Sequence, residues 1–476
     1  MRIGRTSFTI GLAAALSACG GGGTSNSGGG TGVTPTPTPT TSACALATRK
    51  QFAFDVLNEW YLFPTELDTT VNAAGFSDVQ SYIDALVGPP GAKLKDRGFT
   101  YITSIAEENA FFNSGSSAGF GIRLGYDTAA NRVFVIEAFE TGPAFPLGFD
   151  RGVELLSVGT SASTLQSISS LMASGGPQAV INALGASTSG LTRVFSIRSI
   201  SGTTQQVTVT KADFSIDPVS DRYGAKIIND GGKQVGYVNL RTFITTADPD
   251  LRAAFANFRA QGVTEVIVDF RYNGGGLVSI AELMGDLMGR DKVGQVFSYT
   301  TWRASKSDRN STDLFRSQPQ SIAATKIAFI GRAGTASASE LVANAFIPYL
   351  NNNMALVGSN TFGKPVGQFP FDLVACDDRI RAVTFRTENA NRQGDYYTGL
   401  ASVVPNTCRA NDDISAQLGD PAEASVAAAL NFLAGRACTP IAGTPGVQGA
   451  QAVAPARVLL QPDVPSPAQR EVPGLF

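Results

Sequence analysis

Ser337 and Lys364 are the two residues whose types and spacing point to covalent chemistry. The 476-residue sequence contains no histidine, so a serine nucleophile on this chain would have no imidazole base. Lysine can replace it if burial or a neighbouring positive charge lowers its pKa from about 10.4 toward about 7 to 8. We therefore interpret Ser337 as a nucleophile and Lys364, 27 positions later (364 − 337), as its general base.

The surroundings of Lys364 favour a neutral amine. The lysine lies in the segment TFGKPVG, and no carboxylate occurs between Glu340 and Asp372. A hydrogen bond to Gln368, four residues later, would orient the amine without ionising it, whereas a carboxylate in that place would favour the protonated form. The alternative is an ordinary solvated surface lysine.

Ser337 ends a turn of small residues, and the residues after it are compatible with a helix. A nucleophile at a helix N-terminus gains from the positive end of the helix dipole, and the Ala338 N–H is placed to help bind an oxyanion. The alternative is that Thr335, Ser337 or Ser339 only caps this helix, with Glu340 completing a capping box.

A glycine run supplies a second candidate for oxyanion binding. Residues 263–270 (VTEVIVDF) form a β-branched run typical of a buried strand, and Gly274, Gly275 and Gly276 follow it closely. Successive glycines allow backbone N–H groups to approach a ligand. The alternative is an ordinary turn between this strand and a helix at 277–288.

Together, DFRYNGGG at 269–276, GTASASE at 334–340 and TFGK at 361–364 with Gln368 resemble the carboxyl-terminal processing, or tail-specific, protease family. The resemblance covers residues 50–435. It implies a Ser-Lys serine peptidase on an α/β, crotonase-like (ClpP-like) core, with an N-terminal helical segment and a divergent PDZ-like domain. The roles that it carries over are nucleophile, base, orienting partner of the base, and oxyanion donors: Ser337, Lys364, Gln368, and Ala338 with Gly275 or Gly276.

Two features depart from the family pattern. The spacing from Ser337 to Lys364 is slightly longer than usual, and we place the surplus in a turn at 348–354 (PYLNNNM). Ser339 is the alternative nucleophile if that insertion is misplaced. Pro365 stands where the family commonly has glycine, which removes a backbone donor.

The N-terminus is typical of a bacterial lipoprotein. Residues 1–19 combine two arginines, a short apolar run and small residues before Cys19, which predicts a signal peptide and lipidation of Cys19; the alternative is a plain secretory signal. Residues 20–43, rich in Gly, Thr and Pro, predict a disordered linker. We expect a lipid-anchored protein of the cell envelope, on the outer membrane facing the periplasm.

Four further cysteines suggest disulfides, because an exported chain folds in an oxidising compartment. Four cysteines permit three pairings. We prefer Cys376 with Cys408, and Cys44 with Cys438; the alternative is free buried thiols.

The remaining chain divides by pattern. Residues 44–100 predict an N-terminal helical cap, 101–215 a PDZ-like domain, 216–436 the protease core, and 437–476 a flexible tail. The core elements expected are strands at 236–243, 263–270, 326–330 and 354–358 and a helix at 248–261.

Within residues 101–215, a glycine-phenylalanine loop resembles the carboxylate-binding loop of PDZ domains. Such a loop offers N–H groups to a peptide's terminal carboxylate, and the adjoining strand edge accepts the peptide as an added strand. The peptide-binding residues expected are Gly119, Phe120, Gly121 and Ile122. The alternative is a degenerate structural module.

Composition excludes several other functions. The net charge of −2 argues against nucleic-acid binding, and without histidine we expect no catalytic metal and no cofactor. The sequence thus predicts a serine endopeptidase acting on exported proteins or peptides near their C-termini. The rivals are an inactive peptide-binding lipoprotein scaffold and an acyl-CoA enzyme, which export disfavours. Any adaptor or homo-oligomer is left open.

Overall fold

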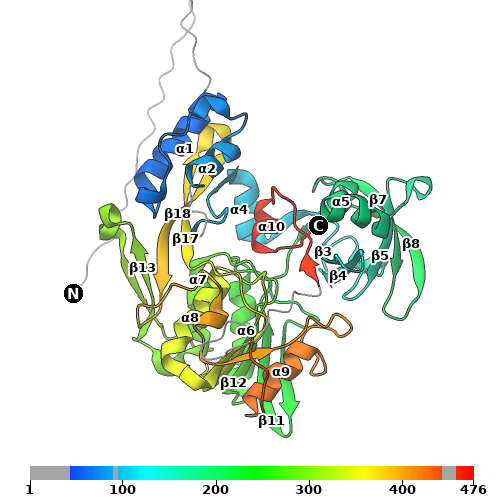
Figure 1. The fold of residues 1–476 in the computed structure, drawn as a ribbon. Coiled ribbons are helices and arrows are strands. Elements are labelled where there is room, and N and C mark those ends of the chain that lie inside the picture. Colours follow the sequence, from blue (N-terminus) through cyan, green and yellow to red (C-terminus); the bar gives the residue numbers. More distant parts are fainter. Residues whose placement is uncertain (1–42, 89–94, 442–456) are drawn as a thin grey trace, which may run out of the picture. The chain divides into compact units, whose positions relative to one another are not determined.

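The computed structural model describes residues 43–88, 95–441 and 457–476 (Figure 1). The predicted signal peptide, Cys19 and nearly all of the linker at 20–43 lie outside these residues. No helix within the described ranges is long and apolar enough to cross a membrane.

The N-terminal segment contains two helices, α1 (Leu46–Trp60) and α2 (Val79–Leu86). Asp78 caps α2, because its carboxylate accepts the Ser81 N–H at 2.8 Å. The apolar faces of both helices share one buried cluster with residues of β17 (Val366–Leu373) and β18 (Asp378–Glu388). The helical prediction for 44–100 is confirmed in α1 and α2, and their burial anchors them to this hairpin.

The β17–β18 hairpin belongs to a five-stranded sheet. Its path is β1-β18-β13-β14, and β17 also pairs with β18. The other strands are β1 (Tyr101–Ser104), β13 (Val296–Trp302) and β14 (Ser311–Leu314). The expected start of a separate domain at residue 101 is therefore wrong, because β1 pairs with β18 through Tyr101 and Arg381. Helix α4 (Ile105–Ser114) follows before the next unit begins.

The core is a six-stranded sheet in the order β10-β11-β12-β15-β16-β19. Only β10 and β11 are antiparallel. The interior strands read as continuous apolar runs because helices cover both faces of a parallel sheet. The strands are β10 (Ala225–Asp230), β11 (Lys233–Asn239), β12 (Glu265–Asp269), β15 (Lys326–Gly331), β16 (Met354–Gly358) and β19 (Thr407–Arg409).

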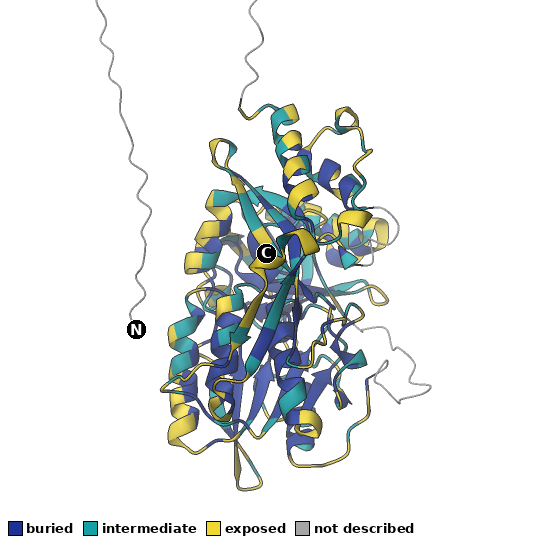
Figure 2. Cartoon of the chain, turned by 90° about the vertical axis from the view of Figure 1, so that its left-hand side faces the viewer, coloured by how far each residue is buried: buried dark blue, intermediate teal, exposed yellow. Residues whose placement is uncertain are grey.

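Helices lie on both faces of this sheet. One apolar cluster contains residues of α6 (Ala247–Ala260), α7 (Val278–Met288) and α8 (Ala338–Leu350), and another contains α9 (Ala424–Leu433). Figure 2 shows the strands as mostly buried and the outer faces of the helices as exposed. The mixed α/β prediction is confirmed. The surplus turn is shorter than predicted, because α8 continues through Pro348 and only 351–353 form a 3₁₀ turn.

Residues 116–215 form a separate layer of mostly antiparallel strands packed on α5 (Ile168–Leu184). The main sheet runs β20-β3-β4-β5-β7-β8, with β6 on β5, and β2 pairs with β9. The strands are β2 (Ser116–Gly119), β3 (Ile122–Asp127), β4 (Arg132–Ala138), β5 (Glu154–Gly159), β6 (Gln166–Ser167), β7 (Thr192–Arg198), β8 (Thr204–Thr210) and β9 (Ala212–Ser215).

Buried ion pairs join this unit to the core. The Glu137 carboxylate on β4 lies 2.7 Å from the Arg241 guanidinium of the core and 2.8 Å from the Arg123 guanidinium of β3. Burial alone would raise the pKa of Glu137, but the guanidinium groups of Arg241 and Arg123 lower it to about 2. Removing one partner would leave an uncompensated buried charge, so these pairs fix the unit against the core.

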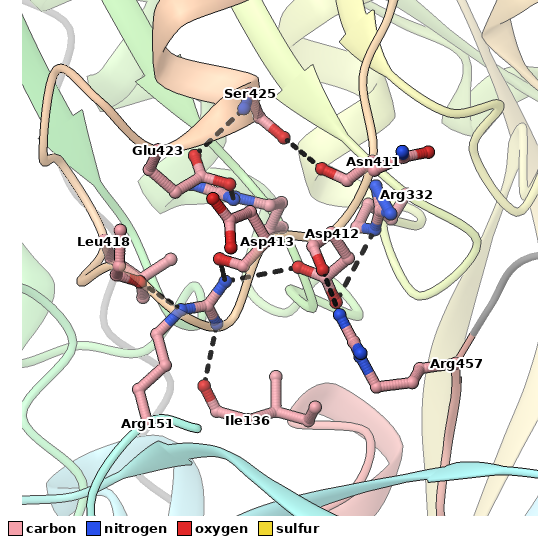
Figure 3. A network of polar contacts seen from close by, with 12 residues as sticks. Ile136, Arg151, Arg332, Asn411, Asp412, Asp413, Leu418, Glu423, Ser425 and Arg457 are labelled. Atoms are coloured by element: carbon pink, nitrogen blue, oxygen red, sulfur yellow. Dashed lines mark hydrogen bonds and ion pairs between the residues drawn. The ribbon is translucent and has the colours of Figure 1, made fainter. Parts of the chain in front are cut away.

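A second polar network lies at the same junction (Figure 3). Arg151 donates to the Ile136 carbonyl at 2.8 Å and the Asp413 carbonyl at 3.0 Å, and it lies 3.2 Å from the Asp412 carboxylate. Asp412 also lies 3.8 Å from Arg332, in the loop that leads to Ser337. The network therefore connects the strand unit with the loop before the candidate nucleophile.

The C-terminal residues differ from the prediction. Residues 457–476 include β20 (Val458–Leu459) and α10 (Pro467–Glu471), and the Phe476 side chain is only 3% exposed. The expectation of a flexible tail from 437 is therefore wrong for 457–476, because its apolar residues are buried against β3 and α4. Residues 442–456 lie outside the described residues.

The cysteines are paired as Cys44–Cys376 and Cys408–Cys438. Disulfide formation was predicted, but the predicted pairing is wrong. Cys44 precedes α1, which packs on the β17–β18 hairpin that carries Cys376. Cys438 follows α9, which packs beside β19 and Cys408. The packing of each helix thus brings its neighbouring cysteine to a partner that sequence order does not reveal.

We expect the double substitution Cys408→Ser with Cys438→Ser to lower the free energy of unfolding by about 2–5 kcal/mol, because it frees a loop in the unfolded chain. Denaturant titration of the oxidised protein measures this. Peptide mapping without reductant is the companion measurement, and fragments joining Cys376 to Cys408 would contradict the pairing described here.

Candidate active site

Ser337 lies in a tight turn between β15 and α8. Its backbone has φ +55° and ψ −115°, a conformation that costs a non-glycine residue about 1–3 kcal/mol. Two bonds hold the turn: the Thr335 hydroxyl donates to the Phe270 carbonyl at 2.7 Å, and the Ala336 N–H to the Asn273 carbonyl at 3.0 Å. The strained turn leaves Ser337 half-buried at the first turn of α8.

The buried carboxylate of Glu340 ties this turn to the lysine loop. One oxygen accepts the N–H groups of Ser337 at 3.1 Å and Lys364 at 2.7 Å. The other accepts the Gly363 N–H at 2.7 Å and the Thr361 hydroxyl at 2.6 Å. Burial raises the pKa of Glu340, while these four donors oppose the rise. The predicted capping box is present, with the Ser337 side chain paired to the Glu340 N–H, but it does not account for the bonds of Glu340 to the lysine loop.

Lys364 makes the predicted contact with Gln368. Its Nζ donates to Gln368 Oε1 at 2.6 Å, and the Gln368 amide donates in turn to the Phe99 carbonyl. The Nζ also lies 5.1 Å from the centre of the Phe99 ring. Burial lowers the pKa of Lys364, although the nearby Glu471 acts to raise it. The site therefore favours a neutral amine, as a lysine base requires.

Ser337 and Gln368 line one cavity of about 110 Å³. Tyr101, Gly276 and Glu471 are also in its wall, so the cavity lies between the serine turn, the glycine run and α10. Within the residues that the structure describes, no group of three or more Asp, Glu, Cys or His side chains is placed to hold a metal ion.

The glycine run lies directly against the serine. A Cβ on Gly275 would lie 2.7 Å from Ser337 Cβ, so only glycine fits there. In this conformation the Gly275 N–H donates to Asn273 Oδ1 at 2.9 Å and the Gly274 N–H to the Glu471 carbonyl at 2.8 Å. The N–H of the expected donor Gly275 is thus already engaged, and Gly276 is the glycine of this run that lines the cavity.

The alternative nucleophile Ser339 has a structural contact instead. Its side chain is fully buried, and its hydroxyl donates to the Asn273 carbonyl at 3.2 Å. Ser337, by contrast, faces the cavity. The geometry favours Ser337.

Several residues of the site were missed in the sequence. Asn273 and Glu340 stand inside the motifs, but their hydrogen bonds connect segments far apart in the chain. Phe99 and Glu471 lie more than a hundred positions from the three active-site motifs at 269–276, 334–340 and 361–368. No local pattern marks either of them, so only the folded chain identifies them.

Comparisons with known proteins agree with the motifs. Residues 234–398 match the model of peptidase family S41. A chloroplastic C-terminal processing peptidase of Tetradesmus obliquus is 30% identical over 55% of this chain and 54% of its own length. A carboxyl-terminal-processing protease of Synechocystis is 25% identical over 68% and 70%. The chain thus spans about half the length of the first of these curated relatives.

A solved structure supports the fold. The crystal structure of a candidate S41 protease of Bacteroides fragilis superposes with a TM-score of 0.62, covering 81% of this chain and 97% of that one at 20% identity. The family match and the named relatives confirm the predicted resemblance to the carboxyl-terminal processing proteases, and this structure supports the fold alone.

We expect Glu340→Gln to lower the free energy of unfolding by about 1–3 kcal/mol, because an amide leaves buried N–H groups of the serine turn or lysine loop without acceptors. Hydrogen exchange at the Ser337 and Lys364 amides should become faster. The control is Asp395→Asn, which changes an exposed carboxylate. Unchanged exchange at both amides in Glu340→Gln would show that the carboxylate does not hold the two segments.

Proposed function

We propose that this chain, which carries a peptidase family S41 domain at residues 234–398, is a serine endopeptidase that cleaves exported proteins or peptides near their C-termini with a Ser-Lys dyad. The observation that carries the proposal is the bond between Lys364 and Gln368 beside the cavity of Ser337. The preference for C-termini is inferred from the relatives, which are C-terminal processing proteases.

In the proposed mechanism, the neutral Lys364 amine takes the proton of the Ser337 hydroxyl as its oxygen attacks the scissile carbonyl. The N–H groups of Ala338 and Gly276 stabilise the oxyanion. The Lys364 ammonium then returns the proton to the leaving amine. A water molecule, deprotonated by the same lysine, hydrolyses the acyl-enzyme and restores Ser337.

We further propose that the core is crotonase-like and that residues 116–215 are a PDZ-like domain. The support for the second assignment is local: the Gly119–Ile122 loop leads into β3, and β3 carries added strand pairing at its outer edge. Peptide recognition by strand addition uses such an edge. The predicted signal peptide and Cys19 add a lipid anchor in the cell envelope, with the catalytic domain facing the periplasm.

The second candidate is an inactive peptide-binding scaffold. The observation that favours it is the engaged state of the glycine run, in which the N–H groups of Gly274 and Gly275 already have acceptors. A resting enzyme shares this state, so reactivity of Ser337 is the property that separates the two.

Fluorophosphonate labelling tests the assignment. We expect an adduct on Ser337 in the wild-type protein and none in Ser337→Ala, with labelling lost or greatly slowed in Lys364→Ala because the base is gone. Intact mass and peptide mapping locate the adduct, and thermal unfolding checks that both variants are folded. Undiminished labelling in folded Lys364→Ala would exclude lysine as the base.

The role of Gln368 predicts a pH effect. Labelling should accelerate as pH rises through the pKa of Lys364, because only the neutral amine acts as a base. In Gln368→Glu, a carboxylate beside Nζ stabilises the ammonium and raises the pKa of Lys364. The rising limb of the plot of labelling rate against pH should therefore move to higher pH by about 1–3 units. The isosteric Gln368→Met removes the acceptor without adding charge and is the control. A limb that does not move in Gln368→Glu would contradict the pairing.

A further inference from the structure

The last residues of the chain extend the sheet of the strand unit. Leu124 donates its N–H to the Gly474 carbonyl at 2.8 Å. Ile122 and Phe476 exchange two bonds, with the Phe476 N–H donating at 2.8 Å and the Ile122 N–H at 3.2 Å. The register is antiparallel, so 474–476 lie beside β3 as an added strand would.

The terminal residue fills an apolar pocket. The Phe476 side chain is 3% exposed and belongs to the same buried cluster as Phe120, Ile122, Met172 and Val180. Two of these residues come from the loop and β3, and the other two from α5. The pocket thus selects a large apolar side chain at the end of a peptide.

The chain end lies against the loop predicted to bind a carboxylate. A Cβ on Gly119 would lie 2.8 Å from the carbonyl carbon of Phe476 and 3.1 Å from its oxygen. Glycine at this position is therefore needed for the Phe476 carbonyl group to approach the backbone. The loop Gly119–Ile122 and β3 thus receive residues 474–476 of the same chain.

The same segment reaches the candidate active site. The Glu471 carbonyl, at the end of α10, accepts the Gly274 N–H at 2.8 Å, and Glu471 lines the cavity of Ser337. The Arg470 guanidinium lies 3.7 Å from the centre of the Tyr101 ring, which is in the same cavity wall. Figure 1 shows α10 and the C-terminus between α4 and the strand unit.

The segment also places two opposing charges near Lys364. The Glu471 carboxylate raises the pKa of Lys364, and the Arg470 guanidinium lowers it. Removal of the segment would free the Gly274 N–H, which now donates to the Glu471 carbonyl.

We propose that residues 466–476 are a built-in ligand that occupies the peptide groove and covers the active site together, and that a protein chain ending in a free carboxylate after a large apolar residue opens the site by replacing it. The inference rests on the proposed function for its catalytic part only, since occupancy of the groove does not depend on cleavage.

The covalent attachment of residues 466–476 determines how strongly they compete with an external peptide. A covalently attached ligand acts at an effective concentration of about 1 mM. For a groove with an intrinsic Kd of about 10 μM, self-occupancy weakens binding of an external peptide about 100-fold. Releasing the tail should recover most of that factor.

The first experiment measures binding of an N-terminally fluorescent peptide with the sequence of residues 467–476 and a free C-terminus, by fluorescence anisotropy. We expect full-length Phe476→Asp, and a chain lacking residues 472–476, to bind it about 100-fold more tightly than the wild type. Val464→Asp is the matched control, because Val464 is in the same tail but 78% exposed; it should bind like the wild type. The amidated peptide should bind none of them well.

The second experiment follows fluorophosphonate labelling of Ser337 in the same proteins. Labelling should be faster in the two released variants than in the wild type and Val464→Asp. The wild type is also titrated with the free-carboxylate peptide, which should accelerate labelling where the amidated peptide does not. This arm needs no variant, so it decides the matter even if the released variants do not fold.

The outcomes separate the two proposals. Equal peptide binding by the wild type and folded released variants overturns the built-in ligand, whatever Ser337 does. Tighter binding with unchanged labelling rates overturns the covering of the active site. Tighter peptide binding with no labelling of Ser337 in any protein supports self-occupancy and contradicts the proposed serine endopeptidase activity. If neither variant folds, labelling of wild-type Ser337 that the free-carboxylate peptide does not accelerate overturns the proposal.

Discussion

The carboxylate of Glu340 is the interaction on which the candidate site depends. It is fully buried, and its four hydrogen bonds come from Ser337 on one side and from Thr361, Gly363 and Lys364 on the other. Buried backbone N–H groups cannot donate to water, so the N–H groups of these two loops need an acceptor within the protein. A single residue thereby sets the separation between the proposed nucleophile and its base.

The hydrogen bonds around Ser337 explain why its strained backbone conformation persists. A residue with φ +55° persists only where the surroundings over-determine it. Glu340 supplies one constraint, and the Asn273 carbonyl supplies another by accepting the Ala336 N–H. The same Asn273 binds the Gly275 N–H through its side chain. The serine turn and the glycine run are therefore held by one another rather than by local sequence.

Buried ion pairs, and not apolar contacts alone, join the strand unit to the core. Glu137 with its two arginines, and Arg151 with Asp412, are buried groups that stabilise only when all partners are present. The tail 457–476 pairs with β3 through Val458–Leu459 and again through residues 474–476, and the Glu471 carbonyl between them accepts the Gly274 N–H. The tail therefore connects the peptide groove along β3 with the hydrogen bonding of Gly274. The proposed self-occupancy acts through these contacts.

By itself, the sequence determined the mixed α/β core, the motifs of the site and the Lys364–Gln368 contact, because buried parallel strands and short motifs are properties of neighbouring residues. Strand β16 at 354–358 was predicted to the residue. Only the tertiary structure decided the disulfide partners, the place of β1 in the sheet of β18 and the roles of Glu340 and Glu471. These depend on which distant segments pack together. The tail shows the reason most clearly: its composition is that of a mobile segment, and a groove formed by residues 119–184 buries its last residue.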